Sequence, residues 1–409
     1  MAAVASSPPA RSARPLRLAI LDDNPFVRAA DGTVHPRAAT FHRFAEAVVR
    51  VGPFQPARYM VPVRDLGVDD PPPALPAIDA LRLSVVPTAP FDGAAGYLRA
   101  APLYYRRNRP IVQAAVSGSD LVWIKAPASN ALLTARASRR AGVPRFTYIA
   151  GSARSVVGAQ ARTGIGGVAA GAAAALYDGV TDWLARSGPT LSIDGELFTS
   201  VLDPDEIDRT PAAVPAKRPD EPWRIVWAGR LAGEKGVPDM LAAVAGLRGR
   251  GRDISVLMIG DGPAAGTLRE DAARYGLAHH VEWAGYIGEP SEYMALMRTG
   301  DLFVLPSRAE GVPKVLVEAM AAGLPVVATR SGRTADVCGD GARGLLVEPG
   351  DIEGLDRAIA LSMDDPRGRL ARRTRALAWA GDHTAEAQAL RLVHWLRGSF
   401  PQLPWPRLP

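Results

Sequence analysis

The segment from Asp301 to Thr329 constrains the fold of this chain more than any other. An apolar stretch, Asp301 to Leu305, predicts a buried strand, and a short polar loop follows it. A helix is expected from Val312 to the glycine at position 323, and a second apolar strand from Pro325 to Thr329. Strand, helix and strand in this order are typical of an α/β fold with a parallel sheet.

Two carboxylates lie within this segment. Glu310 belongs to the loop and Glu318 to the helix, and seven residues separate them. The amino end of a helix attracts anions through its free N–H groups and its dipole. The pattern therefore suits a ligand that places a phosphate at the helix amides and sugar hydroxyls at the carboxylates.

A second strand, loop and helix precede this segment. Trp223 to Ala228 predicts a buried strand, the loop 229–236 follows, and a helix is expected from Val237 to about Arg248. The loop holds Arg230 and Lys235 beside the helix start. An arginine fork and a lysine ammonium can together neutralise a diphosphate.

These two elements resemble the signatures of the retaining glycosyltransferases of family 4, which have the GT-B fold. One matching run is Glu310-Gly311, followed by Glu318-Ala319-Met320-Ala321-Ala322-Gly323-Leu324-Pro325-Val326-Val327. The other is Gly229-Arg230-Leu231, followed by Lys235-Gly236. The turn Gly260-Asp261-Gly262-Pro263 is also similar to the family's, and we interpret it as architectural.

The resemblance implies a role for particular residues. Arg230, Lys235 and Glu310 are the expected catalytic residues, with the two cations on the donor diphosphate and Glu310 on sugar hydroxyls; Glu318 is expected to hold the ribose. The full set of expected donor contacts is Gly229, Arg230, Lys235, Tyr286, Ile287, Glu310, Gly311, Val312, Pro313, Lys314, Val315 and Glu318. For Tyr286 and Ile287 an ordinary core strand and turn is an equal alternative. Pro313 stands where relatives have a glycine, and it has no N–H to donate.

The whole chain alternates between predicted strands and helices. In the first half the expected strands are 16–21, 58–63, 81–86, 120–125, 144–149 and 190–193, and the expected helices are 40–51, 93–115, 129–141 and 162–187. We therefore predict two Rossmann-like, doubly wound domains facing a central cleft, with the last helix crossing back to the first domain. The boundaries are a disordered tail 1–14, an acceptor domain 15–193, a Pro-rich linker 194–221, a donor domain 222–380, and a crossover helix and tail 381–409 with Trp395 as its anchor.

The first domain departs from the family pattern. Relatives carry a paired-glycine loop after the first strand and a histidine at the end of a later one. Here only one glycine follows, and no histidine stands at the equivalent strand ends. The candidates for a helper from this domain are Gly32, Thr33, His35, Lys125, Ser152 and Arg154, and a structural role is the alternative for each.

Composition narrows the classes of function. A length of 409 residues is too great for one core, and a single cysteine, Cys338, rules out an internal disulfide. No metal site is expected, because Asp203-Pro204-Asp205 lies in the Pro-rich linker and His279 and His280 are adjacent. The net charge of +6 permits anionic partners, but no motif with interleaved aromatics indicates nucleic acid.

The arginines between Arg367 and Arg375 predict a solvated helix face, with contact to a membrane surface as the alternative. No stretch is apolar enough to span a bilayer, and residues 1–14 lack the apolar core of a signal peptide. A cytoplasmic location is therefore expected, alone or peripheral to the inner face of the membrane.

The expected function is transfer of a sugar from a nucleotide-diphosphate sugar to a hydroxyl or similar acceptor, with retention of configuration and without a metal ion. No cofactor is expected, and a UDP- or GDP-type sugar is the expected co-substrate. The acceptor remains open among glycans, lipid-linked sugars and small molecules. The alternatives are an epimerase or phosphorylase on the same fold and a non-catalytic sugar-nucleotide-binding subunit.

Overall fold

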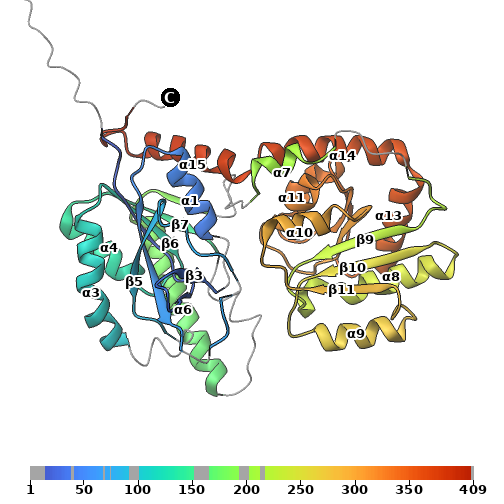
Figure 1. The fold of residues 1–409 in the computed structure, drawn as a ribbon, viewed down its shortest axis with the longest axis horizontal. Helices are drawn as coiled ribbons and strands as arrows, with labels where there is room; N and C mark the ends of the chain where they lie inside the picture. The colour runs from blue at the N-terminus through green and yellow to red at the C-terminus, as the bar shows by residue number, and fades with distance from the viewer. Residues whose placement is uncertain are drawn as a thin grey trace, which may run out of the picture. The chain divides into compact units, whose positions relative to one another are not determined.

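The computed structural model describes residues 14–37, 41–67, 70–73, 75–91, 101–151, 165–192, 202–211 and 217–406. The chain divides into two compact units (Figure 1). Unit 1 contains residues 1–192 and 389–409, and unit 2 contains residues 193–388. The expected crossover is therefore present, because the end of the chain returns to the first unit.

Unit 1 is built on a largely parallel sheet. The strands run in the order β3-β2-β4-β1-β6-β7-β8, and β5 also pairs with β4. Their bounds are β1 Leu18–Leu21, β2 Phe26–Arg28, β3 Val34–Pro36, β4 Ala57–Asp65, β5 Leu83–Thr88, β6 Leu121–Ala126, β7 Arg145–Ile149 and β8 Thr190–Ser192. The strands expected in this half are all present among them.

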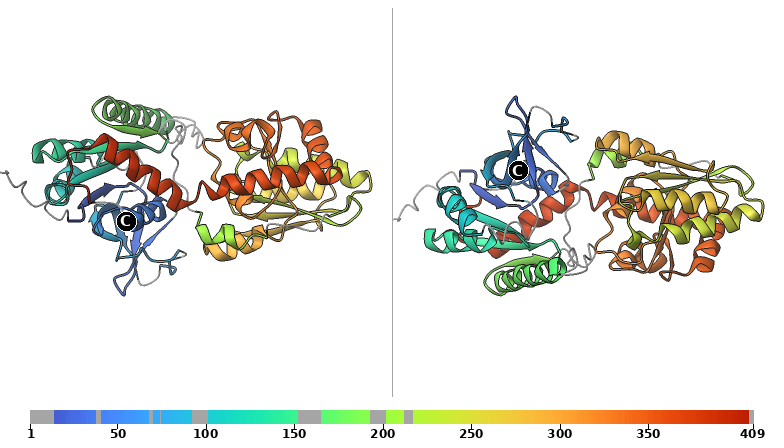
Figure 2. Two further views of the ribbon diagram at one scale, coloured as in Figure 1. Left: turned by 90° about the horizontal axis from the view of Figure 1, so that it is seen from above. Right: turned by 90° about the horizontal axis from the view of Figure 1, so that it is seen from below.

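Helices cover both faces of this sheet. On one face, α3 (Ala101–Ser117), α4 (Ala131–Ala141) and α6 (Ile165–Arg186) bury side chains such as Leu21 and Ile124. On the other face, Trp123 of β6 packs against Phe41 of α1 (Phe41–Val51), with ring centroids 5.2 Å apart. The last helix, α15 (Ala385–Ser399), lies along unit 1 (Figure 2). The ring centroid of its Trp395 lies 5.8 Å from that of Phe146 in β7. The tryptophan thus anchors α15 on unit 1.

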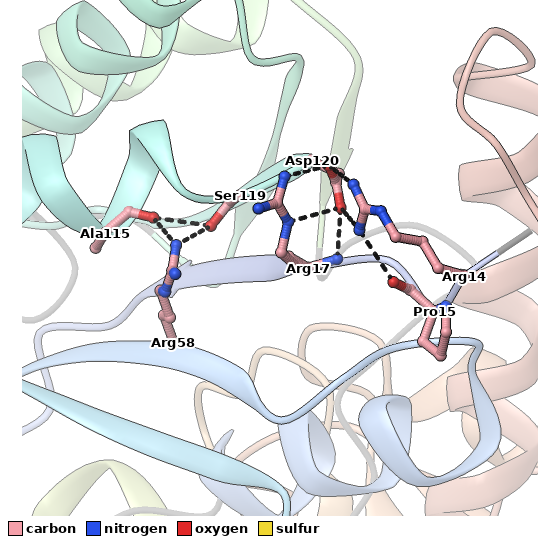
Figure 3. A network of polar contacts seen from close by, with 7 residues as sticks. All are labelled: Arg14, Pro15, Arg17, Arg58, Ala115, Ser119 and Asp120. Carbon is pink, nitrogen blue, oxygen red and sulfur yellow. Dashed lines mark hydrogen bonds and ion pairs between the residues drawn. The ribbon is translucent and has the colours of Figure 1, made fainter.

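An arginine and aspartate network joins the amino ends of β1 and β6 (Figure 3). The carboxylate of Asp120 accepts hydrogen bonds from the backbone and guanidinium of Arg17 and from the guanidinium of Arg14. Partial burial alone would raise the pKa of Asp120, but the hydrogen bonds from the two arginines hold that pKa well below its usual range. Arg14, expected within the tail, is therefore part of unit 1.

The loop expected after β1 is partly a hairpin. β2 and β3 pair antiparallel, and β2 runs parallel to β4 at the edge of the sheet. Gly32, with φ of 86°, lies in the turn between them. The segment that holds Gly32 therefore forms a hairpin, and β2 and β3 extend the sheet beyond β4.

Unit 2 contains a fully parallel sheet in the order β11-β10-β9-β12-β13-β14. The strand bounds are β9 Trp223–Ala228, β10 Ile254–Ile259, β11 Val281–Gly285, β12 Leu302–Leu305, β13 Val326–Thr329 and β14 Leu345–Val347. The helices are α7 Pro204–Asp208, α8 Val237–Gly249, α9 Ala265–Arg274, α10 Pro290–Met297, α11 Lys314–Ala321, α12 Thr334–Cys338, α13 Ile352–Asp364 and α14 Pro366–Gly381, with 3-10 turns η1 Gly233–Lys235 and η2 Gly339–Gly341.

Alternate strand residues face two separate cores, as a doubly wound sheet requires. Trp223, Ile225 and Trp227 of β9 pack with α8, α9 and α13. Val226 and Ala228 of the same strand pack with α10, α11, α12 and α14 on the opposite face. The continuous apolar runs in the sequence reflect this burial on both sides.

The segment expected to link the domains belongs to unit 2 where the structure describes it. Asp203 caps α7 by accepting a hydrogen bond from the backbone of Asp205 at 3.1 Å. Glu206 of α7 is buried and forms an ion pair with Arg298. Residues 202–211 therefore pack onto unit 2, and the Asp-x-Asp spacing is that of a helix cap.

Some arginines of α14 are buried and others are exposed. Arg369 and Arg373 are buried, and they donate to the backbone carbonyls of Ser362 and Gly323 respectively. The expectation of a solvated face is wrong for these two residues, because their guanidinium groups turn inward to donate hydrogen bonds to these carbonyls. None of the helices in the described part of the chain has the length and apolarity needed to cross a lipid bilayer.

Candidate functional site

The candidate site lies at the carboxyl ends of the strands of unit 2. In the observed strand order, the chain continues from β9 to β10 on one side, whereas β12 and β13 lie on the other. The point between β9 and β12 is thus a topological switch point, where the connecting loops diverge and ligands bind in open α/β sheets. The loops after β9 and β12 are the two that carry the sequence signatures.

Close backbone contacts hold these loops together. A Cβ atom on Gly236 would collide with the carbonyl of Pro306, and one on Gly332 would collide with the carbonyl of Glu310. Gly236 also has a φ of 63°, which favours glycine. The backbone N–H of Arg308 donates to the carbonyl of Glu234 at 2.8 Å, so the loops after β9 and β12 form one surface.

An ion pair spans the switch point. The Nζ atom of Lys235, after β9, lies 2.8 Å from Oε1 of Glu310, after β12. The side chains are 21% and 9% exposed, so both charges are largely removed from water. The structure therefore joins the lysine of one signature to the first carboxylate of the other.

Arg230 lies on the exposed side of the same loop. Its guanidinium donates to Oε1 of Glu234 at 2.6 Å, and its side chain is 52% exposed. Partial burial opposes ionisation of Glu234, but hydrogen bonds, including the one from Arg230, keep its pKa below the usual value. Both cations expected at a diphosphate thus have a carboxylate partner in this structure.

The second signature carboxylate also has a partner. Oε2 of Glu318 accepts a hydrogen bond of 2.7 Å from the hydroxyl of Tyr293, which belongs to α10. Glu318 lies in the middle of α11, which begins at Lys314 and not at Val312. The predicted helix start is therefore two residues early, because Pro313 takes the N-cap position.

Several expected donor contacts turn their side chains toward the core. Ile287, Val312 and Val315 pack against the apolar cluster under the site, and Pro313 is buried. By contrast, Tyr286 is 60% exposed and Gly311 is exposed, while Lys314 is half-buried.

The candidates of unit 1 fall in different places. Thr33 and His35 lie in the β2–β3 hairpin, where the hydroxyl of Thr33 contacts Asp31 and Nε2 of His35. Nδ1 of His35 contacts the carbonyl of Leu75 at 2.8 Å, so both ring nitrogens have partners within unit 1. Ser152 and Arg154 lie outside the described residues.

Lys125 takes part in a buried polar group at the carboxyl ends of β1 and β6. Its Nζ atom lies 2.6 Å from Oδ1 of Asp22, which is fully buried and also accepts a hydrogen bond from Tyr59. Burial would raise the pKa of Asp22, but Lys125 and Tyr59 outweigh it and hold the pKa below its usual value.

The neighbouring Asp23 behaves differently. It accepts hydrogen bonds from the backbone and hydroxyl of Ser129, yet burial raises its pKa to about 6. Asp22 and Asp23 are not among the site residues expected from the sequence. The signal was present, because two acidic residues directly follow a buried strand that ends at Leu21.

Part of this chain is similar in sequence to known proteins. Residues 208–378 match the family model described as Glycosyl transferases group 1. The chain is 32% identical over 210 residues to a 2-deoxystreptamine glucosyltransferase of Streptomyces kanamyceticus, covering 49% of this chain and 54% of the relative. It is 30% identical over 265 residues to a glycogen synthase of Mycobacterium tuberculosis, covering 59% of this chain and 63% of the relative. The aligned part thus spans between about half and two thirds of these relatives.

Solved structures match nearly the whole chain. A sucrose-phosphate synthase from Thermosynechococcus elongatus matches with a TM-score of 0.61 at 19% identity, covering 95% of this chain and all of the other. The Anabaena protein HepE in complex with UDP matches with a TM-score of 0.62 at 16% identity, covering 94% of this chain and all of the other. At these identities the likeness shows the fold, which is GT-B, with two parallel-sheet units as expected.

Proposed function

We propose that this chain, a Glycosyl transferases group 1 protein over residues 208–378, is a retaining glycosyltransferase that uses a nucleotide-diphosphate sugar. The proposal extends to the whole chain what the matching segment and the fold support. The named relatives transfer or polymerise sugars, and one structural neighbour holds UDP.

The observation that carries the proposal is the ion pair between Lys235 and Glu310 across the switch point, 2.8 Å long. An enzyme of this class must bind a diphosphate and a sugar side by side, and this pair places a cation beside an acceptor of sugar hydroxyls. When a donor binds, its diphosphate replaces Glu310 as the partner of Lys235, and the freed carboxylate accepts hydrogen bonds from the sugar.

Residues of unit 2 then stabilise the negative charge that develops on the leaving diphosphate. Cleavage of the bond between the anomeric carbon and the diphosphate oxygen leaves negative charge on the phosphate, and Arg230 and Lys235 stabilise it. The amino end of α11 adds its dipole. The acceptor hydroxyl attacks from the face that the diphosphate leaves, and its proton passes to a phosphate oxygen. These cations supply the charge that a metal ion provides in other transferases, so we propose metal-independent transfer.

The acceptor is a hydroxyl or similar group that docks on unit 1. Asp22, Asp23 and Lys125 lie at the carboxyl ends of β1 and β6. In parallel sheets of this kind, ligands bind beyond the carboxyl ends of the strands. A location in the cytoplasm, alone or at the inner face of the membrane, completes the proposal.

The test begins with a panel of nucleoside diphosphates and nucleotide sugars. Thermal shift identifies the base and the sugar, because a ligand at a hundred times its Kd stabilises the folded state by about 2.7 kcal/mol. Hydrolysis and transfer of the best donor are then measured for wild type, Arg230→Ala and Lys235→Ala. Arg367→Ala is the matched control, because Arg367 is exposed on α14 outside the loops of the site.

We expect both site variants to lose at least about a hundredfold in kcat/KM and the control to retain wild-type activity. Wild-type turnover in both site variants would refute the roles of the two cations. Binding of a nucleotide sugar with neither hydrolysis nor transfer across an acceptor panel would instead identify a non-catalytic binding subunit.

A further inference from the structure

A tyrosine outside both signatures contacts the candidate site. Tyr293 lies on α10, 25 positions before Glu318, and its hydroxyl donates to Oε2 of that carboxylate at 2.7 Å. Nothing in the sequence patterns singles it out. The hydrogen bond therefore appears only when α10 and α11 are packed against each other.

The ring of Tyr293 is fixed by its surroundings. It packs on the same apolar cluster as Ile287, Val312 and Val315, which flank the loops of the site. Burial, and then the negative charge of Glu318, raise the pKa of Tyr293 well above its usual value. The hydroxyl consequently stays protonated and remains a donor to the carboxylate.

The helix that carries Tyr293 begins close to the segment expected to meet the nucleotide base. Tyr286 and Ile287 precede α10 by a few residues, and Glu289 caps that helix by accepting from the backbone of Ser291 at 3.3 Å. Tyr293 follows within the first turns. One short helix thus connects the expected base segment to the carboxylate expected at the ribose.

We propose that Tyr293 is a positioning residue, which holds the Glu318 carboxylate in the orientation that accepts ribose hydroxyls of a nucleoside diphosphate. This inference rests on the proposed function. A glutamate has three rotatable side-chain bonds, and a fixed hydrogen bond restricts them before the ligand arrives. Partners of this kind orient binding groups without touching the ligand themselves.

The alternative is that Tyr293 only ties α10 to α11. Both roles predict some loss of stability in Tyr293→Phe, so stability does not separate them. The positioning role predicts a loss confined to ligands with ribose hydroxyls. A purely structural role predicts equal losses for every ligand of the site, or none.

The experiment measures Kd by calorimetry for three probes: UDP or GDP, whichever binds, its 2′,3′-dideoxy analogue, and inorganic pyrophosphate. The proteins are wild type, Tyr293→Phe, Glu318→Gln and the double variant. Tyr275→Phe is the matched control, because Tyr275 lies at the end of α9 with its ring beside Arg274.

We expect Tyr293→Phe to weaken the ribonucleotide about tenfold, the effect of a ribose hydroxyl losing its hydrogen bond to a misoriented Glu318 carboxylate. The dideoxy analogue and pyrophosphate should bind as they do to wild type. The double variant should bind the ribonucleotide no more weakly than Glu318→Gln, since Tyr293 acts through Glu318.

An unchanged ribonucleotide Kd in Tyr293→Phe overturns the positioning role of Tyr293 but not the proposed function. Equal weakening of all three probes has the same consequence. If the wild type binds neither a nucleoside diphosphate nor pyrophosphate, the proposed function fails and the inference falls with it. The wild-type result therefore tells the two failures apart.

Discussion

The ion pair of Lys235 and Glu310 predicts that one lysine serves both folding and ligand binding. Lys235→Met leaves a carboxylate whose side chain is only 9% exposed without its counter-ion. Removing one partner of a largely buried charge pair costs about 2 to 3 kcal/mol, below the figure for complete burial. Glu310→Gln leaves a lysine that is 21% exposed and better hydrated, so its cost should be about 1 kcal/mol.

The double variant, Lys235→Met with Glu310→Gln, separates the two roles. It contains no unpaired charge, so it should be about 1 to 2 kcal/mol more stable than Lys235→Met alone. Since Glu310→Gln alone costs about 1 kcal/mol, the coupling in the double-mutant cycle should be about 2 to 3 kcal/mol. Diphosphate binding should not return, because the cation is still missing. A saturating nucleoside diphosphate should therefore stabilise the wild type by about 2.7 kcal/mol and the double variant hardly at all.

Cys338 provides the assay. It is the only cysteine of the chain and is fully buried in the core of unit 2 under the site, so the rate at which its thiol is labelled in urea reports on that unit separately. A coupling below about 0.5 kcal/mol would show that the pair contributes nothing to folding. A double variant that binds the nucleotide as tightly as wild type would refute the role of Lys235 at the diphosphate.

Three further predictions concern the rest of the molecule. Burial raises the pKa of Cys338 to about 12, so its thiol should resist labelling at pH 8 in native protein and react fully in denaturant; rapid native labelling would contradict the buried position. Burial and the positive charge of Arg43 lower the pKa of His42 to about 4, although the negative charge of Asp22 opposes this shift. His42 therefore contributes stability above its unfolded pKa of about 6.5 and loses it as the pH falls toward 4, by about 2 to 3 kcal/mol. His42→Phe should flatten this dependence in urea titrations at pH 7, 6 and 5, and an equally steep loss in the variant would assign the effect to other groups. Arg373→Ala leaves the Gly323 carbonyl without its donor and should destabilise unit 2 by about 2 to 4 kcal/mol in the thiol assay, whereas exposed Arg367→Ala should stay within about 0.5 kcal/mol. Equal effects of the two arginine variants would count against the buried role of Arg373.

Local pattern was sufficient for most strands of the two sheets. Each expected strand of the first half appears within a few residues of its predicted bounds, and the strand Trp223–Ala228 has the predicted bounds. Apolar runs bounded by turn residues are a short-range property, so a linear reading finds them. The two signature loops were found by their resemblance to a known family. Gly229 and Gly236 in the first of them have φ values of 152° and 63°, which favour glycine.

The hairpin β2–β3 was missed for a physical reason. Its strands are three residues each, too short for a clear alternation of apolar and polar side chains, and they are held by pairing with β4. Likewise, the buried guanidinium of Arg373 could not be predicted, because its partner carbonyl lies 50 positions away.

From its residues alone, this protein is determined to be a two-unit α/β chain with a cationic loop and an acidic loop that resemble a known sugar-transfer signature. Only the tertiary structure decided which charges meet: Lys235 with Glu310 across 75 positions, Tyr293 with Glu318, and Lys125 with Asp22 across 103 positions. Parallel strands bring together loops that are far apart in the chain, and the strand order that selects the neighbours is fixed by packing on both faces of the sheet.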